Sequence, residues 1–96
     1  MSAEALEGEI ERLLAHHGER LEPLGAGIMA AAHLGLISDS RTFARQLGIA
    51  HALVIRACTN LAEEDDFIVI ERREERSQRL HYRLTAKGEA LIREAA

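Results

Sequence analysis

Aromatic residues are scarce in this chain, which has no tryptophan, one tyrosine and two phenylalanines among 96 residues. A chain of this length fits one domain. The hydrophobic fraction of 47% must then build a core that is mainly aliphatic, which excludes an aromatic-rich interior. Proline occurs once and glycine seven times, a composition that favours regular elements joined by short connections. We expect a single domain over residues 1–96.

Cysteine and long apolar runs are also lacking. Cys58 is the only cysteine, which excludes an intrachain disulfide and suits a reducing compartment. The longest nearly apolar run covers the fourteen residues 24–37 and is interrupted by three glycines and a histidine, so it is too short to span a bilayer. The acidic N-terminus has no signal-peptide charge pattern. We therefore expect a cytoplasmic protein with no membrane partner.

Residue patterns for metal binding and catalysis are missing as well. The five histidines lack the spacing of metal ligands, and no second cysteine accompanies Cys58. No nucleophile–base pair, phosphate-binding loop or carboxylate pair occurs at an interpretable spacing. We expect neither enzymatic activity nor a cofactor, and we interpret Cys58 as a small packing residue rather than a redox sensor.

Charge is unevenly distributed along the chain. The net charge is −4, which taken alone argues against a nucleic-acid partner. Residues 1–24 and 63–75 are predominantly acidic, whereas residues 40–62 and 76–87 carry no acid at all. The basic residues of these two acid-free blocks are Arg41, Arg45, Arg56, Arg76, Arg79, Arg83 and Lys87. The simplest interpretation is that solvated charges are segregated by chance. The alternative is that the two acid-free blocks form basic surfaces that bind a polyanion.

Hydrophobic periodicity predicts five helices, at residues 3–17, 23–34, 41–47, 51–63 and 86–95. Leu36 and Ile37 are expected to form a very short strand. The segments "FIVIERRE" and "RLHYRLT" predict two strands of a hairpin, joined by the polar tip "EERSQ". The predicted fold class is therefore mainly α with a small β-hairpin, in the order helix, helix, short strand, helix, helix, strand, strand, helix.

Local signals indicate where these elements end and which faces they bury. Pro23 can open the second helix, Gly18 and Gly48 are candidate helix stops, and Asp39 or Ser40 and then Thr85 are candidate N-caps. The inward residues expected in the third helix are Phe43, Ala44 and Leu47. Those expected in the fourth, at i, i+3, i+4 and i+7, are Val54, Ala57, Cys58 and Leu61.

A helix pair with a short turn, followed by a hairpin, is a winged helix-turn-helix arrangement. The segments "FARQLGIAHALVIRACTNL" and "YRLTAKGEALI" resemble winged-helix transcriptional regulators of the MarR type over about residues 24–92. The first matches a family pattern with Leu-Gly-Ile at the turn, although Ala50 replaces the usual serine. The second matches the end of a wing and the "LTxxG" helix start.

This resemblance implies a dimeric, sequence-specific DNA-binding regulator with double-stranded DNA as partner, a recognition helix at 51–63 and a wing at 72–83. Family members carry further C-terminal helices for dimerisation, so residues 1–22 are expected to carry that role beside a core at 23–96. The expected dimer contacts are Leu6, Ile10, Leu13 and Leu14. The expected DNA contacts are Arg41, Thr42, Arg45, His51, Ala52, Ile55, Arg56, Thr59, Arg73, Arg76, Ser77, Gln78 and Arg79.

The sequence leaves a second function open. Several positions of the expected reading helix are apolar, and only His51, Arg56 and Thr59 could offer polar contacts to bases or phosphates there. The alternative is a winged-helix module for protein–protein interaction, in which Ala52, Leu53 and Ile55 form part of an apolar contact patch. The operator, the regulated genes and any small-molecule effector stay open.

Overall fold

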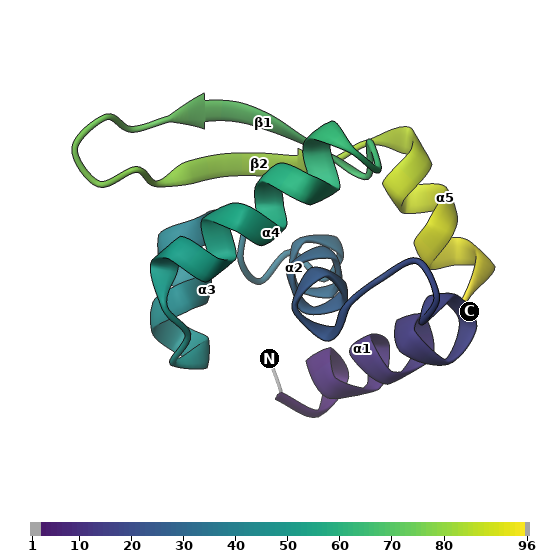
Figure 1. Cartoon of the computed structure of the whole chain (residues 1–96). Helices are drawn as coiled ribbons and strands as arrows, with labels where there is room; N and C mark the ends of the chain where they lie inside the picture. Colours follow the sequence, from purple (N-terminus) through teal and green to yellow (C-terminus); the bar gives the residue numbers. More distant parts are fainter. Residues whose placement is uncertain (1–2, 96) are drawn as a thin grey trace.

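The computed structural model describes residues 3–95, and within them the chain is mainly helical with one antiparallel hairpin (Figure 1). This confirms the predicted class at that level. Positions 1–2 and 96 of the predicted domain lie outside the described residues. The elements are α1 (Ala3–His17), α2 (Pro23–His33), α3 (Ser40–Leu47), α4 (His51–Glu63), β1 (Ile68–Arg73), β2 (Leu80–Leu84) and α5 (Ala86–Glu94).

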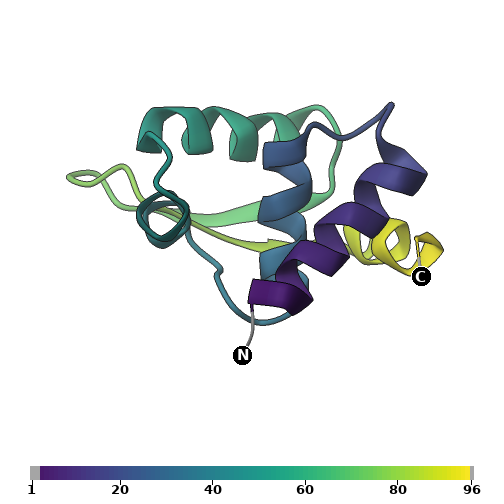
Figure 2. The ribbon, with the colours of Figure 1, turned by 90° about the horizontal axis from the view of Figure 1, so that it is seen from below.

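Helix α2 lies at the centre of the molecule, with the other elements arranged around it (Figures 1 and 2). Its residues 25–31 are all buried. Glycine and alanine let neighbours approach closely: a Cβ added at Gly25 would lie 3.4 Å from Leu61 Cδ2, and one at Gly27 would lie 3.3 Å from Phe43 Cζ. Most of the apolar run at residues 24–37 therefore forms the central helix of the core. An apolar surface on all sides of a helix is typical of such a buried position. Within residues 3–95 no helix is both long and apolar enough to cross a membrane.

Helices α3 and α4 are joined by a tight turn whose ends match the sequence signals. The Asp39 carboxylate accepts a hydrogen bond from the Thr42 N–H at 2.9 Å and caps α3. Gly48 ends α3 in the left-handed region, at φ +66°, a conformation that glycine adopts without strain. Helix α4 has the predicted bounds and buries Val54, Cys58 and Leu61.

The hairpin pairs Ile68 with Leu84 and continues to Arg73 opposite Leu80, with an irregularity in register at Glu71. Its buried face carries Leu80 and Tyr82. In Figures 1 and 2 its tip extends past α3, at the end of the molecule where α4 begins. The turn after β2 leads into α5, where Thr85 Oγ1 accepts from the Gly88 N–H at 3.0 Å, as the cap prediction required.

Two local predictions are wrong. Leu36 and Ile37 form no strand, because their N–H groups donate to Ala31 O at 2.9 and 3.3 Å and so close the end of α2. The segment before α3 pairs with the hairpin through one isolated β-bridge, between Asp39 and His81. Leu47 is not inward but 41% exposed. Helix α1 ends at His17, directly before Gly18, as predicted. The N–H groups of Arg20 and Leu21 both donate to His17 O at 2.9 Å and close this end.

Candidate nucleic-acid interface

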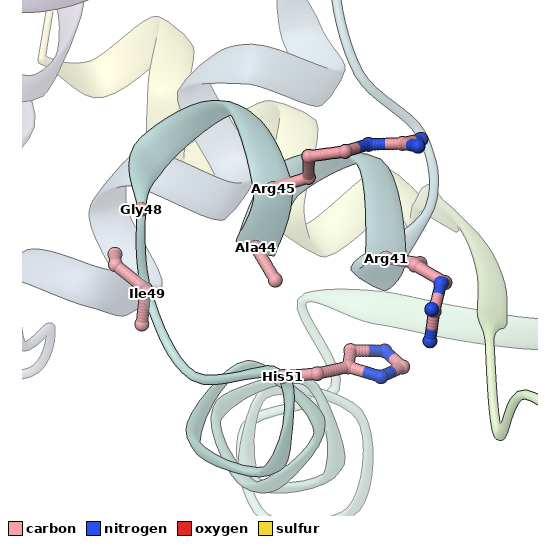
Figure 3. Close-up of a pocket in the computed structure, with 6 residues that line it drawn as sticks. All are labelled: Arg41, Ala44, Arg45, Gly48, Ile49 and His51. Carbon is pink, nitrogen blue, oxygen red and sulfur yellow. The ribbon is translucent and has the colours of Figure 1, made fainter.

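A basic cleft lies between α3 and the beginning of α4. It has a volume of about 390 Å³ and is lined by Arg41, Ala44, Arg45, Gly48, Ile49 and His51. Figure 3 shows the two arginines of α3 and the histidine of α4 extending toward the same side. None of the ion pairs among residues 3–95 involves Arg41 or Arg45. Both guanidinium groups are exposed and therefore keep their charge available for an anion.

The histidine of the cleft is held by a buried serine. Ser40 is completely buried, and its Oγ accepts a hydrogen bond from the Leu80 N–H at 2.9 Å. Its hydroxyl hydrogen is then free to donate to His51 Nε2, which lies 2.8 Å away. Nε2 acting as an acceptor requires the neutral imidazole. This small network joins the starts of α3, α4 and β2.

The surroundings of His51 also disfavour its protonation. Burial lowers the pKa of His51, and the positive charges of Arg41 and Arg79 lower it further, against the opposing effect of Asp39. A histidine whose pKa is lower in the folded than in the unfolded chain stabilises the fold at pH values above its ordinary pKa of 6.5. That contribution is lost as the pH falls through 6.5 toward the folded pKa.

We accordingly expect His51→Gln to reduce the acid sensitivity of the fold. Glutamine can accept the Ser40 hydrogen bond but cannot be protonated near neutrality. Between about pH 7.5 and about pH 5.5, the free energy of unfolding should fall less in this variant than in the wild type. Urea denaturation at both pH values measures it. An equal fall in both proteins would show that His51 is not the group responsible.

Acidic side chains neutralise part of the hairpin. Arg79 Nε lies 3.5 Å from Asp39 Oδ2 and 4.0 Å from Glu74 Oε2. The carboxylate of Glu74 also lies 2.6 Å from His81 Nε2 and 3.7 Å from Arg72. The hydrogen bond with His81 lowers the pKa of Glu74. Arg79 is thus a half-buried anchor at the base of the hairpin tip rather than a free cation.

The predicted contact residues at the hairpin tip divide into two groups. Ser77 accepts from the Arg79 N–H at 3.1 Å and donates to Glu74 at 3.3 Å. Gln78, at φ +60°, donates from its side chain to Glu75 O at 2.7 Å. These two side chains shape the turn. Arg73 and Arg76 are exposed, and neither takes part in an ion pair within residues 3–95, so they are the available cations of the tip.

The exposed face of α4 is rotated from the predicted one. Ala52 and Arg56 are exposed as expected, but Ile55 and Thr59 are half-buried, and the Thr59 hydroxyl donates to Ile55 O at 2.9 Å. The exposed stripe is Ala52, Leu53, Arg56, Asn60 and Glu63. Asn60 was missed, and Leu53 was expected only in the protein-contact patch of the second function, because Ala57 was placed in the core; Ala57 is only half-buried. Placing the core centre at Val54, Cys58 and Leu61 alone would have found them.

Two further predicted roles can be located. Cys58 is fully buried, and burial raises the pKa of its thiol to about 12, so it remains protonated as a packing residue. Of the expected dimer contacts on α1, Leu6, Ile10 and Leu14 are half-buried. Leu13 is completely buried in the chain's own core, which removes it from any surface that a second copy could touch.

Searches of protein-family models, of curated proteins and of solved structures find no match to this chain. The functional argument therefore rests on the chain's own geometry.

Proposed function

We propose that this chain is a winged helix-turn-helix protein that binds double-stranded DNA as a dimer. The observation that carries the proposal is the basic cleft, where Arg41 and Arg45 are exposed and engaged in no ion pair among residues 3–95. Arginine groups of this kind bind phosphate oxygens through charge-assisted hydrogen bonds. The hairpin tip and the first turn of α4 lie at the same end of the molecule as α3 (Figures 1 and 2).

In this proposal α4 enters a major groove through the exposed face that begins at Ala52. Arg56 is its cationic reader and can donate to guanine, whereas Ala52 and Leu53 can contact thymine methyl groups. Arg73 and Arg76 bind the flanking backbone from the hairpin tip. Helix α1, which carries four acidic residues against one arginine, lies on the other side of α2 from α4 (Figure 1).

The proposal includes a dimer because one copy reads few bases. Each good bidentate base contact discriminates by about 1–3 kcal/mol, and the exposed stripe of α4 carries one arginine in its first two turns. Two copies on a two-fold symmetric site double this discrimination. Leu6, Ile10 and Leu14 of α1 are the apolar residues with partial exposure that support a contact between copies.

Replacing Arg41 by glutamate should weaken DNA binding by about ten- to hundredfold, the range of one lost charge-assisted hydrogen bond. Arg93→Glu is the matched control, since Arg93 is also an exposed helical arginine without an ion pair among residues 3–95 and lies on α5. DNA selected from a random duplex pool, then measured by fluorescence anisotropy at about 50 and about 200 mM salt, provides the readout. The salt dependence should become shallower by about one unit in Arg41→Glu.

The same measurement distinguishes DNA binding from the second candidate function, a module for protein–protein interaction. Leu47 and Leu53 are the large hydrophobic residues exposed within 3–95, at 41% and 49%, and they flank the turn between α3 and α4. That exposure favours a protein partner. An absence of DNA binding even at the lower salt concentration would refute the DNA-binding proposal and leave this one. Equal binding by Arg41→Glu and wild type would refute the basic cleft as the DNA contact.

A further inference from the structure

The charge of the basic cleft depends on one histidine. Of the described residues that line the cleft, only His51 can gain or lose a proton near neutral pH. Its half-buried side chain extends from the first residue of α4 toward the same side as Arg41 and Arg45 (Figure 3). Both arginines keep their charge throughout the pH range in which proteins are folded. Protonation of His51 would therefore add a third positive charge to the two that are always present.

Charged groups face the His51 imidazole from each element packed against it. Arg41 and Arg45 belong to α3, and Arg79 directly precedes β2 at the base of the hairpin tip. Asp39 is the acid among these groups, and its carboxylate lies 3.5 Å from Arg79 Nε. Burial lowers the pKa of His51, and the charges of Arg41 and Arg79 lower it further, against the effect of Asp39. The imidazole is therefore neutral near neutral pH as long as no anion binds.

The hydrogen bonds of Ser40 also oppose protonation of the imidazole. Ser40 Oγ accepts the Leu80 N–H at 2.9 Å and lies 2.8 Å from His51 Nε2, which accepts the hydroxyl hydrogen when the ring is neutral. A protonated Nε2 carries a hydrogen of its own, so the Ser40 hydroxyl would have to turn away from the ring. Because Ser40 is completely buried, its hydrogen could not reach water there. A buried donor without an acceptor is destabilising.

We propose that the cleft takes up a proton at His51 when it binds a phosphate of the DNA backbone, so that DNA binding strengthens as the pH falls. This inference rests on the proposed DNA binding. A phosphate beside Arg41 and Arg45 offsets the repulsion between the arginines and the imidazolium. His51 would then be a proton-dependent phosphate ligand, next to two arginines that bind phosphate at any pH.

The direction of the pH dependence follows from linkage. A group that holds its proton more tightly in the complex than in the free chain makes the affinity for DNA rise as the pH falls through the pKa of the complex. The rise ends below the pKa of the free chain, which is lower than the ordinary 6.5. A neighbouring opposite charge strengthens proton binding by about tenfold or more. We therefore expect DNA binding to tighten by about tenfold per copy of the chain.

The test uses fluorescence anisotropy of the full chain with a mixed-sequence DNA duplex, since phosphate contacts carry no sequence information. From about pH 7.5 to about pH 5.5, the wild type should tighten by about tenfold. His51→Gln should lose most of this change, because glutamine accepts the Ser40 hydrogen bond but is not protonated. His33→Gln is the matched control. His33 is also half-buried, but it lies on α2 and contacts Glu89 at 3.2 Å, outside the cleft, so this variant should keep the change.

NMR titration of the wild-type His51 ring, with and without the duplex, measures the proton uptake directly. The pKa of His51 should be higher in the complex than in the free chain. An unchanged pKa, or the same pH dependence of binding in His51→Gln and wild type, would overturn this inference and leave DNA binding intact. An absence of DNA binding at both pH values would refute the proposed function together with this inference. Circular dichroism at both pH values verifies that each protein is folded.

Discussion

Replacing Gly88 by alanine should lower the free energy of unfolding by about 3 kcal/mol, the upper part of the usual range for overpacking. A Cβ at Gly88 would lie 2.1 Å from Phe67 O and 3.0 Å from Phe67 C. That carbonyl cannot easily retreat, because it accepts the Thr85 N–H at 3.0 Å where the hairpin leads into α5. Urea denaturation measures the loss.

Gly8→Ala is the matched control, because both glycines lie in helices and both variants add one methyl group. A Cβ at Gly8 would have only the Arg12 guanidinium near it, at 3.8 Å. Alanine there should raise the free energy of unfolding by about 0.5–1 kcal/mol, the difference in helix propensity. If Gly88→Ala were as stable as the wild type, the close packing of α5 on the entry to β1 would be disproved.

Removing the Ser40 hydroxyl should cost about 1–3 kcal/mol of stability, since Ser40→Ala leaves the buried Leu80 N–H without its acceptor. His51 loses its partner in the same substitution. The expected readouts are a lower midpoint in urea and faster hydrogen exchange of the Leu80 amide. Ser38→Ala, at an exposed position two residues earlier, should change stability by less than about 0.5 kcal/mol.

Retention of Leu80 amide protection in Ser40→Ala would contradict this account of the network. A loss of stability with unchanged Leu80 exchange would place the cost elsewhere in the core. The comparison therefore distinguishes the specific hydrogen bond from the effect of removing an atom from a packed interior.

The fold was predictable where local chemistry and periodicity agree. Helix α4 was predicted at its bounds because Gly48 ends the preceding helix and the inward positions recur at helical spacing. Asp39 and Thr85 were found as caps because an acceptor side chain at that position satisfies free N–H groups of the first turn. The caps act within four residues and the helical spacing within eight, so neither needs knowledge of the tertiary structure.

The candidate site was less predictable because its geometry depends on long-range contacts. The contact between Ser40 and Leu80 spans forty positions, and nothing in either local sequence indicates it. Arg79 falls in an acid-free block of the sequence, but in the fold its Nε lies 3.5 Å from the carboxylate of Asp39, an acid outside the four charge blocks. The exposed face of α4 differs from the predicted one because Ala57, which the helical spacing placed in the core, is only half-buried, whereas Leu53 is 49% exposed.

Ile49 lines both the basic cleft and an apolar hollow that α1, α2 and α3 also line, so the two hollows share part of one wall. It lies in the three-residue connection between α3 and α4. A substitution at Ile49 would therefore alter the lining of a charged surface and of an apolar one at the same time.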